Sequence, residues 1–462
     1  MILPIIFLGL YASQCFGAGI NFYPKTRSLK PDGHCGKRLF LTPYIEDGNI
    51  IAARKASRVK PYLANVESYS GFLTINKTTN SNMFFWFFPA ENNPANAPVA
   101  LWLQGGPGAP SVDAIFTENG PFVVTDSLSL KRRKHYWSQE ISVIYIDNPV
   151  GTGFSFTNSD GYVTNESEVG RDLYAALQQF FQLFPEYQKN DFFVTGESYA
   201  GKYIPAIAYT IHTNNPTSSS KINLKGIAIG DGLVDPENMM VYGEYLYEHG
   251  LIDSRMLIKF QEIEAQVIKQ IQAKQFDDAF VTFDKMLNGD LTPYKTLFWN
   301  ATGLTSYFNY VTSNTNTNSG GSVENWLAKS KNRLRIHVGD QIYDEGNKVE
   351  MHLKADVMQS VRPWLEVLMD HYRVLLYNGQ LDIIVAYPLT MNYVKKLQWK
   401  GKKEYEQAER KLWYVNGELA GYAKNAGNFT EILVRNAGHM VPTDQPLWAL
   451  DMITKFTQNI PF

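Results

Sequence analysis

Cysteine is almost absent from this chain of 462 residues, which contains only Cys15 and Cys35. No CxxC or HExxH pattern occurs either, so the sequence predicts no metal site. An excess of charge of one sign is also missing, because 43 Lys and Arg residues face 45 Asp and Glu residues, for a formal net charge of −2. Without a basic surface, binding to nucleic acid or to anionic lipid is not expected.

Long apolar runs are missing beyond the N-terminus. Residues 1–17 are apolar and uncharged, and the first cation is Lys25. A short apolar run followed by the small residues Gly17 and Ala18 is typical of a secretory signal peptide. The run is shorter than the roughly 20 apolar residues that a membrane span needs, so an N-terminal anchor is the less favoured interpretation. The sequence therefore predicts a signal peptide at 1–17 and a mature protein that is secreted or lysosomal, without a membrane span.

Two features agree with passage through the secretory pathway. Cys15 would leave with the signal peptide, so the mature chain would hold Cys35 alone and could form no internal disulfide. The N-x-S/T rule gives candidate glycosylation sites. They are Asn76, Asn165, Asn300 and Asn428.

The content of apolar residues (44%) and of aromatic residues (14%) is sufficient for a large core and excludes a disordered chain. Short apolar runs predict strands that are buried on both faces. They are Asn82–Phe88, Val99–Leu103, Val143–Ile146, Phe192–Thr195, Gly226–Ile229, Arg373–Tyr377 and Glu431–Val434. An apolar stripe from Leu173 to Phe184 predicts a helix that ends near Pro185. Strands that alternate with helices indicate a mainly parallel sheet with helices on both faces, the α/β class.

The spacing of strands changes after Asp235. About 140 residues separate the runs that begin at Gly226 and Arg373, which is too many for one crossover connection. Glu244–Leu287 is polar and favours helix, whereas Thr312–Ser322 is rich in Ser, Thr, Asn and Gly and is expected to be an exposed loop. We therefore expect one domain over 18–462 with a mostly helical cap insertion at roughly 240–345.

The segment Phe192–Gly201 carries the sharpest chemical signal. A predicted strand runs into Gly-Glu-Ser-Tyr-Ala, with Ser198 at the centre, and a helix-like segment follows. This order of strand, tight turn and helix is the nucleophile elbow, in which the start of the helix places backbone amides beside the serine. Ala200 stands where the common pattern has Gly, so a plain turn before a helix is the alternative for this motif taken alone.

Three further pieces accompany the elbow. A glycine-rich turn after Val99–Leu103 could point backbone amides at a developing oxyanion, although a plain turn is the alternative. Asp382 follows the strand that begins at Arg373, and His439 follows the strand that ends at Val434. Either residue alone would commonly be a surface or turn residue. The chain order Ser198, Asp382, His439 is that of a catalytic triad in the α/β-hydrolase fold.

Several segments resemble the signature blocks of the serine carboxypeptidase family, in family order from roughly Val66 to Phe456. They are WLQGGPG, IDNPVGTGFSF, GESYAGKYIP, IGDGLVDP, YNGQLDIIV and NAGHMVPTDQP. The C-terminal half, with IHVGDQ, WKGKKEY and ELAGY, is similar to the vitellogenic-like carboxypeptidase branch. The resemblance implies an α/β-hydrolase fold and a serine-type carboxypeptidase without a cofactor, which removes C-terminal residues from peptides and proteins.

The resemblance also implies a role for each matching residue. Ser198 would be the nucleophile, His439 the general acid and base, and Asp382 the residue that orients the imidazole. The amides of Gly106 and Tyr199 would form the oxyanion hole. The substrate's terminal carboxylate would be bound by Gln104, Gly105, Glu118 and Glu197.

The chain departs from the family pattern at two places in this region. Gln104 replaces the usual Asn, as in the vitellogenic-like branch, and keeps an amide on a longer arm. Ala109, Pro110 and Ser111 replace a Cys-Ser-Ser segment, which removes a cysteine that many relatives pair. Neither departure touches the three triad residues.

Two other functions are compatible with the same scaffold. An acyl-enzyme can be intercepted by an alcohol, as in an acyltransferase, or formed from an ester. A binding protein could keep the fold without the reaction, which the three intact triad residues argue against. For a peptidase, two clustered glutamates facing a carboxylate predict best activity at acid pH, because only a protonated carboxyl can donate a hydrogen bond to the substrate.

Overall fold

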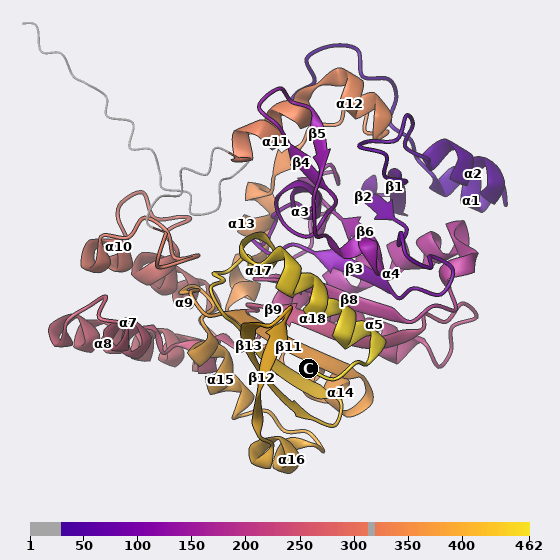
Figure 1. Ribbon diagram of the computed structural model, residues 1–462. Coiled ribbons are helices and arrows are strands. Elements are labelled where there is room, and N and C mark those ends of the chain that lie inside the picture. The colour runs from indigo at the N-terminus through magenta and orange to yellow at the C-terminus, as the bar shows by residue number, and fades with distance from the viewer. Residues whose placement is uncertain (1–28, 313–318) are drawn as a thin grey trace, which may run out of the picture.

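The computed structural model describes residues 29–312 and 319–462, and a ten-stranded sheet runs through its centre (Figure 1). The six middle strands, from β6 to β14, are parallel, and the two strands at each edge are antiparallel to their neighbours. In spatial order the strands are β1 (Tyr69–Asn76), β2 (Ser81–Phe88), β6 (Ser142–Ile146), β3 (Val99–Leu103), β8 (Phe192–Glu197), β9 (Leu224–Gly230), β11 (Arg373–Gly379), β14 (Phe429–Val434), β13 (Glu418–Ala426) and β12 (Arg410–Val415). Two small sheets pair β4 (Phe122–Val124) with β5 (Leu130–Arg132) and β7 (Thr152–Gly153) with β10 (Asp344–Glu345).

The predicted strands are confirmed, each to within two residues at either end. Every residue of β2, β3, β6 and β14 is buried, which explains why their runs are apolar without alternation. The sequence reading missed β1, β12 and β13. In β12 four of the six residues are exposed, Leu412 and Tyr414 among them, so its short apolar run does not mark a strand buried on both faces.

Helices cover both faces of the sheet, as predicted, and the sheet separates two apolar cores. The first face packs against α4 (Glu166–Leu183), α5 (Ala200–Asn214) and α14 (Arg362–His371), and the second against α3 (Ser111–Thr117) and α18 (Pro446–Gln458). Helix α4 ends before Pro185, as its apolar stripe indicated. The other helices outside the β9–β11 connection are α1 (Thr42–Glu46), α2 (Ile50–Ser57), α15 (Tyr387–Val394), α16 (Lys402–Gln407), α17 (Val441–Asp444) and the 3₁₀ turns Trp137–Gln139 and Pro185–Tyr187.

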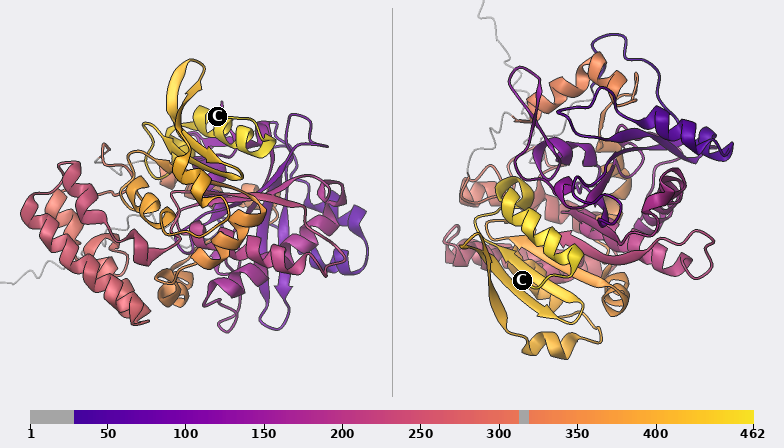
Figure 2. Two further views of the ribbon diagram at one scale, coloured as in Figure 1. Left: turned by 90° about the horizontal axis from the view of Figure 1, so that it is seen from below. Right: turned by 45° about the vertical axis from the view of Figure 1, so that its right-hand side comes forward.

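The connection between β9 and β11 is mostly helical. Helices α7 to α10 gather on one side of the sheet, whereas α11 lies beside α3 and β4 and packs against α12 (Figures 1 and 2). Besides α14 and β10, the elements of this connection are α6 (Pro236–Met239), α7 (Tyr242–Glu248), α8 (Ser254–Gln272), α9 (Phe276–Phe283), a π-helical turn (Asp284–Asn288), α10 (Leu297–Thr302), α11 (Ser319–Ala328), α12 (Ser330–Arg335) and α13 (Asn347–Val357). The predicted single-domain and cap boundaries stay predictions.

The loop expected at Thr312–Ser322 is wrong at its C-terminal end, because α11 already begins at Ser319. Val323, Trp326 and Leu327 lie on one side of this helix and are buried, so apolar burial outweighs the low helix propensity of its glycines. Residues 313–318 of the expected loop, like the predicted signal peptide at 1–17, lie outside the described residues. No helix in the described ranges is long and apolar enough to cross a membrane.

Cys35 is free and buried, and it is the one cysteine within the described ranges. We therefore expect the melting temperature of the mature protein to be insensitive to dithiothreitol. Loss of a native disulfide typically costs about 2–5 kcal/mol, which would lower the melting temperature by several degrees. Calorimetry with and without the reductant checks this expectation, and a marked drop would reveal a covalent contact through Cys35.

Candidate active site

Ser198 occupies a strained turn between β8 and α5. Its φ of +64° lies in the left-handed region, which non-glycine residues rarely adopt. The turn is held by backbone bonds: Ser198 N donates to Gly230 O (2.9 Å), and Ser198 O accepts from Leu233 N (3.0 Å). A Cβ on Gly196 would collide with the carbonyl oxygen of Leu103, so only glycine fits two positions before the serine. This is the geometry of the nucleophile elbow predicted from the sequence.

The glycine-rich turn after β3 lies directly against this elbow. Strands β3 and β8 are parallel neighbours, and Leu103 is paired with Gly196, so the turns that follow them meet at one edge of the sheet. A Cβ on Gly105 would lie 2.5 Å from the amide nitrogen of Tyr199 and 2.6 Å from the Cβ of Ser198. The next residue, Gly106, has a φ of +110°, which favours glycine. The backbone can approach Ser198 this closely only because these side chains are absent.

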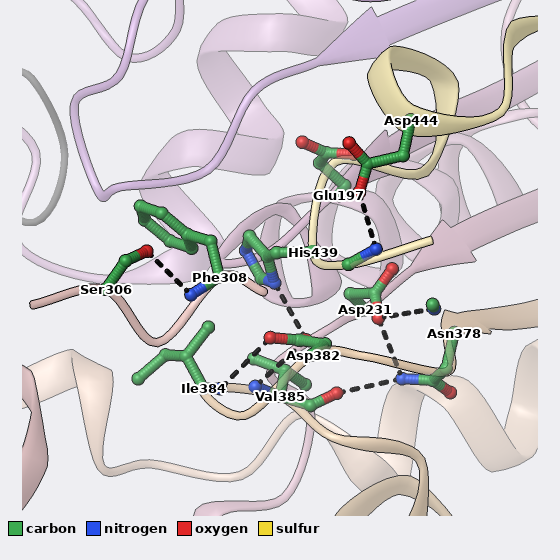
Figure 3. Close-up of polar contacts among 12 residues, drawn as sticks. Glu197, Asp231, Ser306, Phe308, Asn378, Asp382, Ile384, Val385, His439 and Asp444 are labelled. Atoms are coloured by element: carbon green, nitrogen blue, oxygen red, sulfur yellow. Dashed lines mark hydrogen bonds and ion pairs between the residues drawn. The ribbon is translucent and has the colours of Figure 1, made fainter. Parts of the chain in front are cut away.

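Asp382 and His439 form a buried hydrogen-bonded pair (Figure 3). They follow the adjacent parallel strands β11 and β14, and His439 Nδ1 lies 2.9 Å from Asp382 Oδ2. The amide of Ile384 donates to Asp382 Oδ1 (3.0 Å) and that of Val385 to Oδ2 (3.2 Å), so that both carboxylate oxygens are oriented. Each oxygen thus accepts a backbone hydrogen bond, and Oδ2 faces the imidazole nitrogen as well.

A segment from the β9–β11 connection holds the histidine from the other side. The amide of His439 donates to Phe308 O (2.7 Å), and the two rings are stacked with centroids 5.1 Å apart. The amide of Gly438 donates to Asp444 Oδ2 (2.7 Å), which fixes the turn before His439 (Figure 3). Nε2 of His439 is buried and forms no hydrogen bond with any described residue, Ser198 included. Such catalytic bonds commonly form only when substrate is bound.

Two glutamates and a glutamine meet in a buried cluster beside Ser198. Gln104 Nε2 donates to Glu197 Oε1 (3.1 Å), and Trp102 Nε1 donates to Gln104 Oε1 (3.1 Å), which orients the amide. The carboxyl groups of Glu118 and Glu197 are hydrogen-bonded to each other, which requires a proton between them. Burial raises the pKa of Glu118 to about 7. Burial and the neighbouring Glu118 raise the pKa of Glu197 well above its usual range.

Asp231 also lies in this site, and the sequence analysis assigned it no role. It is the first residue after β9, is fully buried, and lies beside Asp382 and His439 (Figure 3). Its position directly after a central parallel strand was the available signal, since the C-terminal ends of such strands meet at one edge.

Among the described residues, Asp231, Asp382 and His439 form the one group that brings three possible metal-ligand atoms together, within 4.8 Å of one another. The two atoms that a cation would need most, Asp382 Oδ2 and His439 Nδ1, are already hydrogen-bonded to each other at 2.9 Å. The second oxygen of Asp382 accepts from a backbone amide. This donor set fits a proton-sharing network, so we assign no metal or cofactor to it.

A buried ion pair connects the elbow helix to α13. Lys202 Nζ lies 2.6 Å from Asp356 Oδ2, and Tyr199 OH donates to the same oxygen (3.1 Å). Removing one partner of such a pair would leave an uncompensated buried charge, which is strongly destabilising. The start of α5, and with it the amide of Tyr199, is therefore held rigidly.

The candidate glycosylation sites are accessible to different degrees. Asn76, Asn300 and Asn428 are exposed. Asn165 is half-buried, and its Oδ1 accepts a hydrogen bond from Glu168 N (3.1 Å) as the N-cap of α4. A glycan on the side-chain nitrogen of Asn165 would leave that oxygen free to act as the cap.

Comparison with known proteins agrees with this geometry. The family profile described as "Serine carboxypeptidase" matches residues 59–459. The chain belongs to the serine carboxypeptidase family. It is 53% identical to the venom serine carboxypeptidase of Apis mellifera over 447 residues, which is 96% of both chains. It is 49% identical to the vitellogenic carboxypeptidase of Aedes aegypti over 437 residues, which is 94% of this chain and 92% of the mosquito protein.

The fold is shared with a more distant carboxypeptidase of known structure. Kex1, a prohormone-processing carboxypeptidase of Saccharomyces cerevisiae, superposes with a TM-score of 0.75 at 22% identity and covers 88% of this chain and 96% of its own. The α/β-hydrolase fold predicted from the sequence is thereby confirmed. As a member of the serine carboxypeptidase family, the protein is a serine-type carboxypeptidase, a hydrolase that acts on peptides.

Proposed function

We propose that Ser198, His439 and Asp382 carry out this hydrolysis through an acyl-enzyme. Ser198 Oγ would attack the carbonyl carbon of the last peptide bond while His439 Nε2 takes its proton. The same imidazole would then give the proton to the leaving amine, and a water molecule would hydrolyse the ester by the reverse sequence. The strained turn at Ser198 and the buried bond between His439 Nδ1 and Asp382 Oδ2 support these roles.

The oxyanion of the tetrahedral intermediate would be stabilised by the amides of Gly106 and Tyr199. Tyr199 directly precedes α5, where the helix dipole adds partial positive charge. The close approach of Gly105 to Ser198 and Tyr199 supports this arrangement, because it brings the two turns to one point.

Gln104, Gly105, Glu118 and Glu197 would bind the terminal carboxylate of the substrate. The observation that carries this proposal is the hydrogen-bonded cluster of Gln104, Glu197 and Glu118, since Glu197 directly precedes the nucleophile. A carboxylate held there would place only the last peptide bond at Ser198, so residues would leave one at a time. Because a carboxyl donates a hydrogen bond only when protonated, peptide hydrolysis should be most efficient at acid pH.

The location of the protein is proposed on the same basis. Activity at acid pH would suit a lysosome-like or acidified secretory compartment. A signal peptide at 1–17 and glycans at the exposed sequons would be consistent with that location. The exposed positions of Asn76, Asn300 and Asn428 support their use as glycosylation sites.

A pair of peptides separates this function from the alternatives. The mature protein is incubated with a peptide that has a free C-terminal carboxylate and with its amidated twin, and the products are followed by mass spectrometry. We expect stepwise loss of residues from the free acid, with the amide cleaved at least about tenfold more slowly because it lacks the bound carboxylate. Equal cleavage of both would exclude the proposed carboxylate site. If neither peptide is cleaved but a simple ester is hydrolysed, the esterase or acyltransferase is favoured. If no substrate reacts, a binding protein is favoured.

A further inference from the structure

A four-residue segment of the β9–β11 connection, Tyr307–Tyr310, bonds to the loops that carry the acid and the base of the proposed triad. We call this segment the strap. On the side of the acid, its first carbonyl accepts from the amides of Ile383 (3.0 Å) and Ile384 (3.3 Å). Its last amide donates to Leu381 O (3.0 Å). The strap is therefore bonded to the backbone on both sides of Asp382.

On the side of the base, the carbonyl of Phe308 accepts from the amide of His439 (2.7 Å). The approach is so close that a Cβ on Gly438 would lie 2.3 Å from the same oxygen, so only glycine fits before His439. Asn309 Nδ2 donates to Asp444 Oδ2 (3.2 Å), the oxygen that also accepts from the Gly438 amide. The loops of the acid and the base are thus joined through one segment of the connection.

The side chain of Phe308 lies on the face of the imidazole of His439 (Figure 3). The two ring centroids are 5.1 Å apart, and the ring planes are inclined by 24°. Tyr307 packs edge-on against Phe308, with centroids 4.8 Å apart, and both side chains are buried. The phenyl ring on the imidazole is therefore held in place by a second buried ring.

One hydrogen bond does not fix the plane of an imidazole. The bond between Nδ1 and Asp382 Oδ2 (2.9 Å) fixes one edge of the His439 ring, whereas the χ2 torsion of histidine is broad. Nε2, the atom that would take the proton of Ser198, is buried and has no hydrogen-bond partner among the described residues. A ring stacked on the imidazole restricts its tilt, and so it supplies the constraint that Nε2 lacks.

We propose that Phe308 is a positioning residue of the triad, whose ring, stacked on His439, holds the imidazole in the plane from which Nε2 can exchange a proton with Ser198. This inference rests on the proposed roles of Ser198 and His439. An aromatic ring also serves the reaction in a way that an aliphatic side chain could not. The imidazolium formed in acylation and in deacylation lies within the roughly 6 Å at which a ring face attracts a cation.

The substitutions Phe308→Leu and Phe308→Met test the proposal, because each removes the ring face and keeps a large apolar side chain. We expect kcat to fall by at least about tenfold for a free-acid peptide and for a simple methyl ester alike, since both halves of the reaction use the same imidazole. KM should stay within about twofold of wild type for both substrates. Phe308→Tyr keeps the ring face, and its kcat should stay within about threefold of wild type.

Two other roles of Phe308 would give different results. If the ring only filled the core, Phe308→Leu and Phe308→Met would lower the melting temperature and keep the wild-type kcat, and the proposal would be wrong. If the ring contacted the substrate instead, KM would rise for the peptide while the ester was hydrolysed at the wild-type rate, which would also overturn it. Equal losses in Phe308→Tyr and Phe308→Leu would exclude the stacked ring face as the cause.

Phe280→Leu is the matched control, because Phe280 on α9 is a buried phenylalanine of the same connection. It should lower the melting temperature and leave kcat unchanged. Reaction of Ser198 with a fluorophosphonate should slow in Phe308→Leu by the same factor as kcat, since it depends on the same imidazole. Labelled wild type together with a fully active Phe308→Leu variant would refute the role of Phe308 alone, whereas an unlabelled, inactive wild type would refute the proposed function.

Discussion

Replacement of Ser198 by alanine is expected to lower peptide turnover by at least about four orders of magnitude while the protein stays folded. The loss follows from removal of the nucleophile, since no other group at the site can form the acyl-enzyme. Folding should survive because the Ser198 side chain forms no hydrogen bond with any described residue, and the turn is held by backbone bonds to Gly230 and Leu233. The melting temperature should change by no more than about 2 °C.

A covalent probe checks the same expectation independently of turnover. A fluorophosphonate should add once to the wild type, on the peptide that contains Ser198, and should not add to Ser198→Ala. The label should also be lost in His439→Ala, because the serine is then no longer deprotonated. Ser138→Ala is the matched control: Ser138 is a buried serine in the 3₁₀ turn Trp137–Gln139, and its hydroxyl has no hydrogen-bond partner among the described residues. Undiminished turnover by folded Ser198→Ala would end the triad assignment.

The central part of the fold could be predicted from the sequence because its strands are buried on both faces. Such strands have a continuous apolar run, as in β2 and β3, and a run of this kind has few other interpretations. Strands β12 and β13 escaped prediction because exposed charged and polar residues interrupt their apolar residues, among them Lys411, Glu418 and Asn425. The start of α11 at Ser319 escaped because burial of Trp326 and Leu327 is a tertiary effect that overrides local propensity.

The sequence predicted the residues of the site but only some of the contacts between them. Motif order alone pointed to Ser198, Asp382 and His439, because the fold brings the ends of parallel strands to one edge. Which strands are neighbours cannot be read from the chain: β9 lies between β8 and β11, so Asp231 meets Asp382 across about 150 residues of sequence. The bond from Gln104 to Glu197 likewise depends on the pairing of β3 with β8.

The second large effect is expected from the glutamate cluster and concerns the pH dependence of KM. Burial raises the pKa of Glu118 to about 7 and that of Glu197 well above its usual range. A raised pKa means that the neutral, donating form is present below it and is lost as pH rises through it. For a peptide with a free carboxylate, KM should therefore be low at acid pH and rise above pH 7 by up to about tenfold per unit, the limit for binding that requires one proton. An ester without that carboxylate should keep a nearly constant KM.

Glutamine substitutions test whether this proton is the cause. The variant Glu197→Gln has a donor that no base can remove, so its KM for the free-acid peptide should rise less steeply with pH than that of the wild type. The double variant Glu118→Gln/Glu197→Gln should show almost no pH dependence of KM, since neither group can become a carboxylate that repels the substrate.

Glu264→Gln provides the control for these substitutions. Glu264 on α8 is also buried, and burial raises its pKa to about 7. Its carboxylate accepts from the Gly243 amide (2.7 Å) and belongs to no part of the site. Its KM profile should match that of the wild type. The raised pKa values of Glu118 and Glu264 affect folding stability in the same direction. Each stabilises the folded protein at low pH, and that contribution disappears as pH rises through about 7. Melting curves would thus shift with pH in all these proteins, whereas only Glu197→Gln and the double variant would change KM. If free-acid and blocked substrates gave the same pH profile, unaltered by Glu197→Gln, the substrate carboxylate would have to be bound elsewhere.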